Sequence, residues 1–87
     1  MKQADLPDLR NRIAKLARKS PLGKRVRDVV VEAGDYGDGT EFLRVVLQLK
    51  DLDSLEPKEA EPLVQSIENE VALIDERFPS VRFADAA

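Results

Sequence analysis

The sequence predicts an α+β domain in which a three-stranded, mainly antiparallel sheet is covered on one face by two helices. Between residues 26 and 50, apolar residues alternate with polar ones on either side of a glycine-rich link. Apolar residues recur at steps of three and four before and after this stretch, and a short alternating segment follows near the C-terminus. A period of two is typical of strands and a period near 3.6 of helices, so the element order is α-β-β-α-β. We expect one domain spanning residues 1–87, with residues 1–5 and 85–87 frayed.

The two central strands form the predicted hairpin. Their apolar positions share one face, and we expect that face to be the core: Val29, Val31, Ala33, Leu43, Val45, Leu47 and Leu49. The link from Gly34 to Thr40 contains three glycines, which adopt positive φ at low cost. An antiparallel hairpin with a wide turn follows from this pattern.

A first helix is predicted from about Pro7 to Lys19, with Asp5 as N-cap and an apolar stripe that includes Leu9 and Ile13. A second is predicted from about Glu61 to Arg77, because Pro62 would clash inside a regular helix that began near residue 55. Its inward stripe is expected to comprise Leu63, Val64, Ile67, Val71, Ile74 and Phe78.

The last strand is predicted over residues 80–84, where Val81 and Phe83 alternate with polar neighbours. We expect it to lie beside the first strand of the hairpin and antiparallel to it, which gives the strand order 2-1-3. Both helices would then cover the same face of the sheet.

The composition argues against most catalytic and metal chemistry. The 87 residues include no cysteine and no histidine, so thiolate nucleophiles, Cys-type zinc sites and the commonest general base are missing. The acidic loop around Asp35, Asp38 and Glu41 does not have the EF-hand spacing. We therefore expect no enzyme activity, no cofactor, no metal and no small-molecule substrate. An apolar run long enough to span a bilayer is also missing, and we expect a cytoplasmic protein without a membrane partner.

The second face of the hairpin is the main candidate site. It is more apolar than a solvated sheet face usually is, which favours a protein interface. The simplest partner is a second copy of the chain, and a larger protein partner is the other possibility. The alternative is a surface on which charged side chains cover the valines with their apolar stems. The predicted contact residues are Val26, Val30, Phe42, Arg44 and Val46.

The charge is unevenly distributed along the chain. Residues 1–27 contain nine basic and two acidic residues, a net +7, which leaves −10 for the rest of a chain whose net charge is −3. A nucleic-acid interface is therefore the alternative function, although no aromatic residues interleave with the basic ones for base stacking. Its candidate residues are Arg10, Arg12, Lys15, Arg18, Lys19 and Lys24. An antitoxin-like or immunity-like partner, which would neutralise a basic protein through the acidic second helix, is a third possibility.

Residues 26–83 resemble the cytoplasmic C-terminal domain of cation diffusion facilitator transporters. The similarity is carried by the hairpin segments Val29-Val30-Val31 and Val45-Val46-Leu47, by Ser54-Leu55-Glu56 and Glu59-Ala60 in the helical region, and by Glu76-Arg77-Phe78-Pro79 before the last strand. The resemblance implies this fold and a tendency to dimerise. That family can bind metal through histidines, but here Glu61 follows Ala60 and the last strand contains no histidine. The resemblance therefore does not extend to metal regulation.

Overall fold

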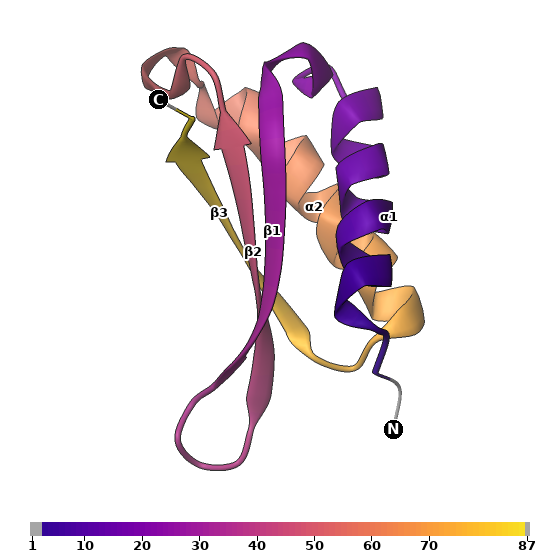
Figure 1. The fold of residues 1–87 in the computed structure, drawn as a ribbon. Coiled ribbons are helices and arrows are strands. Elements are labelled where there is room, and N and C mark those ends of the chain that lie inside the picture. Colours follow the sequence, from indigo (N-terminus) through magenta and orange to yellow (C-terminus); the bar gives the residue numbers. More distant parts are fainter. Residues whose placement is uncertain (1–2, 87) are drawn as a thin grey trace.

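The computed structural model describes residues 3–86 and has the predicted α-β-β-α-β order (Figure 1). Its elements are α1 (Leu6–Lys19), β1 (Val26–Asp35), β2 (Glu41–Leu49), α2 (Pro57–Ile74) and β3 (Phe78–Asp85), with single 3-10 turns at Gly23–Arg25 and Leu52–Ser54. The tip of the hairpin projects well beyond the ends of the helices (Figure 1). The α+β class and the order of the elements are confirmed.

The strand order is 1-2-3, so the predicted order 2-1-3 is wrong. Strand β1 pairs antiparallel with β2, and β3 pairs with β2 in parallel, which makes the sheet mixed rather than mainly antiparallel. The expected direction of β3 is correct, but its neighbour is β2 rather than β1. A chain that leaves β2, forms α2 and returns as β3 is a β-α-β crossover, which favours a parallel position beside the strand it left.

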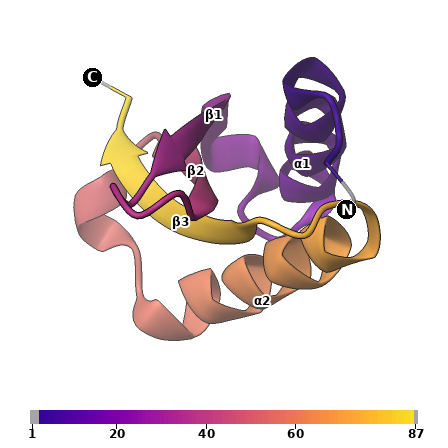
Figure 2. The same cartoon turned by 90° about the horizontal axis from the view of Figure 1, so that it is seen from below.

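Both helices share one core with one face of the sheet. The side chains of β1 and β2 in this core include Val29, Leu43, Val45, Leu47 and Leu49, all fully buried, as their alternation predicts. Val31 is half-buried, whereas Ala33 is exposed, so its assignment to the core is wrong. Helix α1 packs along β1, whereas α2 packs along β3. The two helices therefore lie next to each other on the same side of the sheet (Figures 1 and 2).

Helix α1 begins one residue earlier than predicted, with Asp5 at the N-cap position and Pro7 in the first turn. The Asp5 side chain makes no capping hydrogen bond. At the other end Ser20 stops the helix, because its Oγ donates to the carbonyl of Ala17 at 2.6 Å and accepts from the amide of Leu22 at 3.2 Å. Leu9, Ile13, Ala14 and Ala17 form the buried stripe.

Helix α2 starts at Pro57 and runs through Pro62, so the predicted start near Glu61 is wrong. Pro57 occupies the first turn, where the missing N–H is not needed, and the carboxylate of Glu59 accepts a hydrogen bond from the amide of Glu56 at 3.2 Å. Burial of Leu63 and residues further along the stripe compensates for the hydrogen bond that Pro62 removes. The helix ends at Ile74, three residues before its predicted end.

Strand β3 is longer than predicted and begins at Phe78, a residue expected in the stripe of α2. Phe78 is 60% exposed, so its assignment to the core is wrong. The expected fraying does not extend to Ala4, which is hydrogen-bonded to Asp75, or to Asp85, which pairs with Leu49. Residues 1, 2 and 87 lie outside the described residues. Within residues 3–86, no helix is both long and apolar enough to cross a membrane.

Candidate interaction surface

The sheet face that the helices leave uncovered, here called the open face, is arranged in rows across the three strands. Each row has a β2 residue at its centre, flanked by its partners on β1 and β3. From the hairpin end the rows are Gly34–Phe42–Phe78, Glu32–Arg44–Ser80, Val30–Val46–Arg82 and Asp28–Gln48–Ala84. Because β2 is central, the predicted contact residues Phe42, Arg44 and Val46 lie along the middle of this face.

An aromatic cluster occupies the hairpin end of the open face. The rings of Tyr36 and Phe42 lie with centroids 4.7 Å apart and planes tilted by 32°. The guanidinium carbon of Arg44 is 5.9 Å from the centroid of Phe42, within cation–π range. Tyr36 and Phe78 are each 60% exposed, so both leave large aromatic surfaces open to solvent.

Gly34 makes this cluster possible. A Cβ atom on Gly34 would lie 2.4 Å from Cζ of Phe42, so the ring of Phe42 occupies the space that any other side chain would fill. The glycine-rich link was predicted to supply positive φ, and Gly37 and Gly39 do have φ of 91° and 90°. Gly34 instead sits in β1 and is required for close packing.

Val26 was predicted on the open face, and that prediction is wrong. A register irregularity lies between Val26 and Asp28, and Val26 pairs with Leu49, whose side chain belongs to the core. Val26 is only 8% exposed and packs with the buried residues. A bulge adds one residue to a strand, so the side chains before the bulge point to the opposite face from the one that alternation predicts. The alternation pattern itself does not reveal a bulge. Val30, Phe42, Arg44 and Val46 remain on the open face.

The basic residues proposed for nucleic acid divide into two groups. Arg10 pairs with Asp28 at 3.1 Å, and Arg12 pairs with Glu70 at 3.7 Å, so both already have an acidic partner within the chain. The others have exposed side chains with no acidic partner within 4.0 Å among residues 3–86: Lys15, Arg18, Lys19 and Lys24. The positive charge of the N-terminal segment is therefore partly neutralised by acidic side chains of β1 and α2.

The acidic loop residues have a structural role in the hairpin. A carboxylate oxygen of Asp35 accepts from the amide of Gly37, and one of Asp38 accepts from the amide of Thr40 at 2.9 Å. The hydrogen bond from the Thr40 amide is the main reason that the pKa of Asp38 is lowered. Among residues 3–86, no three acidic side chains are gathered closely enough to hold a metal ion.

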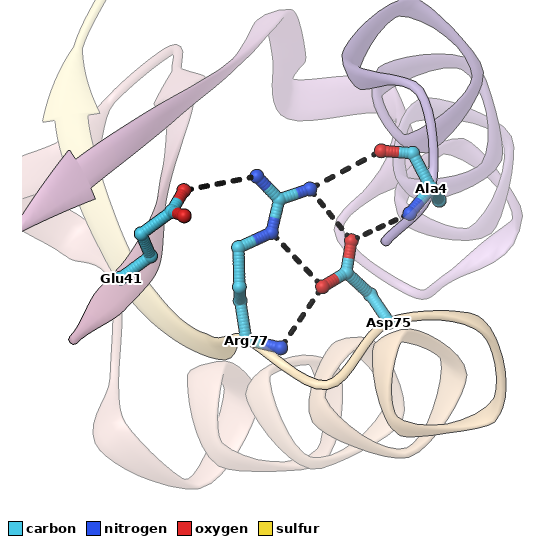
Figure 3. A network of polar contacts seen from close by, with 4 residues as sticks. All are labelled: Ala4, Glu41, Asp75 and Arg77. Carbon is cyan, nitrogen blue, oxygen red and sulfur yellow. Dashed lines mark hydrogen bonds and ion pairs between the residues drawn. The ribbon is translucent and has the colours of Figure 1, made fainter. Parts of the chain in front are cut away.

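A buried ion pair, missed in the sequence, joins the N-terminal segment to the loop before β3 (Figure 3). The Arg77 guanidinium donates from Nε to Oδ1 of Asp75 at 3.0 Å and from Nη2 to Oδ2 at 2.8 Å, a bidentate pair. The amide of Ala4 donates to Asp75 Oδ2 at 2.9 Å, while Ala4 O accepts from Arg77 Nη2 at 3.1 Å. Glu41 on β2 approaches Arg77 Nη1 at 3.8 Å.

Both members of this pair are nearly inaccessible, with side-chain exposures of 0% for Asp75 and 7% for Arg77. Burial raises the pKa of the Asp75 carboxyl, but the hydrogen bonds from Arg77 and Ala4 outweigh it and lower the pKa to about 2. The hydrogen bond to Asp75 likewise raises the pKa of Arg77. The only sequence signal was an Asp and an Arg two residues apart beside Pro79, which is too common a pattern to indicate burial.

Two solved structures of MamM have a similar fold. A doubly substituted MamM C-terminal domain superposes with a TM-score of 0.54 at 17% identity, covering 93% of this chain and 94% of that one. A singly substituted MamM gives 0.52 at 16% identity, covering 98% and 89%. No protein-family model matches the chain, and no curated protein matches its sequence. The resemblance to the C-terminal domain of cation diffusion facilitators is thus confirmed for the fold.

Proposed function

We propose that this protein is a non-catalytic interaction domain that self-associates through the open face of its sheet. The observation that carries the proposal is a pair of apolar rows on the open face, on either side of the row Glu32–Arg44–Ser80. Val30 and Val46 are neighbours in one row, and Phe42 pairs with Phe78 in the other, where its ring also packs against Tyr36. The solvent-facing side of a sheet is usually mostly polar, whereas this one keeps two rows with apolar side chains that a partner would bury.

The charges of the open face are arranged for pairing with a second copy. The acidic residues Glu32 and Asp28 lie on the edge strand β1, where Asp28 already pairs with Arg10 of its own chain, whereas the basic residues Arg44 and Arg82 lie on β2 and on the opposite edge strand β3. Most homodimers use a two-fold axis, which brings the same patch of both copies together. If that axis runs parallel to the strands between two stacked sheets, β1 of one copy lies over β3 of the other. The acidic edge strand of each copy then faces the basic edge strand of the other. The two Arg44 side chains meet near the axis on β2, each beside Glu32 of its own sheet.

The absence of histidine and cysteine from the chain supports the non-catalytic part of the proposal. The shared fold is compatible with the dimerisation that the family resemblance implies. The partly neutralised basic face of α1 gives the nucleic-acid alternative less support, because Arg10 and Arg12 already have acidic partners.

Light scattering coupled to size exclusion, at micromolar concentration, tests the proposal. We expect a dimer mass for the natural chain at low and high salt, because apolar association is little screened. Val46→Asp should give a monomer, since it places a charge in the centre of the interface. Asn69→Asp, which adds the same charge on the exposed side of α2, is the matched control and should remain dimeric. A monomer mass for the natural chain, or an unchanged mass for Val46→Asp, would contradict the proposal.

Adding duplex DNA or single-stranded RNA in the same experiment distinguishes nucleic-acid binding from self-association. A complex that forms at low salt and dissociates steeply as salt rises would indicate binding to phosphates through α1. If it survives Val46→Asp but is lost in Lys15→Glu/Arg18→Glu, the basic helix is the functional site instead.

A further inference from the structure

The two helices are held together at one end and separated at the other. They run in opposite directions along the sheet, so the C-terminus of α1 and the N-terminus of α2 lie at the same end (Figure 1). Midway along α1, Arg12 pairs with Glu70 of α2, and at the far end the Ala4–Asp75–Arg77 network ties the start of the chain to the loop after α2. Where the helices separate they leave an open cavity of about 500 Å³, here called the helix groove.

Apolar side chains and prolines dominate the helix groove. Leu16 comes from the last turns of α1, Leu22 from the loop that follows it, and Leu63 from α2. Pro21 and Pro62 also line the groove, and Pro62 has no N–H to offer to a ligand. The remaining lining residues are Lys19, Ser20, Lys58, Glu59 and Ser66. This combination of an apolar surface with a few polar groups is typical of small-molecule sites.

The charged residues of the helix groove leave an excess of positive charge. Lys19 on α1 has no acidic group within 4.0 Å among residues 3–86, and Lys58 on α2 pairs only with the exposed Glu56, at 3.3 Å. The one acidic lining residue, Glu59, is used at the start of α2, where its carboxylate accepts from the amide of Glu56. The groove thus offers an apolar surface and two cationic side chains, one from each helix.

We propose that the helix groove binds a small amphiphilic anion. Its apolar body would lie on Leu16, Leu22 and Leu63, and its carboxylate, sulfate or phosphate head would pair with Lys19 and Lys58. The cavity volume falls within the roughly 300–1,000 Å³ usual for small-ligand sites. Only ten residues line the groove, whereas a stable protein interface uses roughly 20–30 on each side. The size therefore favours a small ligand over a docked protein.

Titration of the ¹⁵N-labelled full chain, followed by NMR, tests this with two probes of equal tail length. Sodium decanoate is the anionic probe and nonyltrimethylammonium the cationic one, so both have a nine-carbon tail, and both are kept below the concentration at which they form micelles. We expect saturable shifts at Lys19, Leu22, Lys58 and Ser66 with decanoate, and binding about tenfold weaker with the cation. Equal binding of both probes, or shifts confined to the open face of the sheet, would overturn the proposal.

Two variants locate the site. Lys19→Glu/Lys58→Glu changes two exposed side chains, so the fold should persist while decanoate binding falls about tenfold. The matched control is Arg27→Glu/Lys50→Glu, which makes the same charge change at exposed positions outside the groove and should keep the affinity of the natural chain. Ser66→Trp places a large ring in the groove from its exposed edge and should abolish binding. If the control loses as much affinity as the groove variant, general charge attraction explains the binding and the proposal fails.

A synthetic acidic amphipathic helix distinguishes a small ligand from a protein. If this peptide displaces decanoate and binds more tightly than it, the groove is a docking site for a helix and the proposal is overturned. The groove lies on the helix side of the sheet, opposite the open face. The oligomeric state of the chain and the binding of decanoate can therefore succeed or fail independently.

Discussion

Two neighbouring residues of β2 show how differently the two faces of the sheet are used. The side chain of Leu47 points into the core and is fully buried between the sheet and the helices. That of Val46 lies on the open face between Val30 and Arg82 and is only partly buried. Both are aliphatic residues in the same strand, so hydrophobicity alone does not distinguish them. The covered face provides most of the buried apolar area, whereas the open face leaves part of the Val46 side chain exposed.

The largest difference is expected when both positions are changed to alanine. Leu47→Ala should lower the free energy of unfolding by about 3–4 kcal/mol, because it removes buried methyl groups and leaves a cavity under both helices. Val46→Ala should cost less than about 1 kcal/mol in the monomer. Urea unfolding at a concentration too low for association measures both. Equal costs at the two positions would mean that the open face is as well packed as the core.

Removing the buried ion pair of the covered side is expected to have the next largest effect. Asp75→Asn keeps the size of the side chain but leaves the buried Arg77 guanidinium with only the more distant Glu41, at 3.8 Å, as a counter-charge. We expect a loss of about 2–3 kcal/mol at neutral pH. Glu70→Gln removes the more exposed pair with Arg12 and should cost less than about 0.5 kcal/mol. If the two variants were equally stable, the Asp75–Arg77 pair would contribute no more than a surface ion pair.

Acid should remove the same contribution without a mutation. The pKa of Asp75 is lowered in the folded state from 3.8 to about 2, so its stabilisation is complete above pH 4 and is lost as pH falls toward 2. The shift corresponds to about 2 kcal/mol. Thermal or urea unfolding between pH 5 and 2 should therefore show a steeper loss for the natural chain than for Asp75→Asn. Parallel curves would show that other carboxylates dominate acid unfolding.

The smallest effect is expected at the aromatic end of the open face. Gly34→Ala would place a methyl group where the ring of Phe42 lies, and the ring can move away because that face is open. We expect a loss of about 1 kcal/mol and a changed NMR environment for Tyr36, the only tyrosine of the chain. In a Phe42→Leu background the same alanine should be nearly neutral. Equal costs in both backgrounds would exclude a clash with the ring as the cause.

The local sequence pattern was enough to identify both α-helices and all three strands. It also predicted, for most residues, whether the side chain points into the core or to solvent. The alternation of β2 correctly separated Leu47 from Val46, and the stripe of α2 correctly contained Leu63 and Ile67. The resemblance to the cation diffusion facilitator C-terminal domain was also detected from short segments and is confirmed by the fold. These properties depend on neighbours a few residues apart, which a single sequence displays.

Parts of the candidate surfaces depended on contacts that the sequence does not display. The bulge near Val26 changed which face that residue occupies, and Phe78 joined the open face because α2 ended earlier than its apolar pattern suggested. The helix groove was missed because residues from two separated helices line it, among them Leu16 and Leu63. In the sequence, each of these residues only fits the apolar stripe of its own helix.

The sequence by itself determined the α-β-β-α-β order and the apolar face of each element, because periodicity fixes which side chains of a helix or strand point the same way. Only the tertiary structure decided that β3 lies beside β2, that Asp75 and Arg77 are buried together, and that the helices separate at one end. These features arise from the pairing of segments far apart in the chain. Their free energy depends on which surfaces meet, and that information is spread over the whole fold rather than contained in any one stretch.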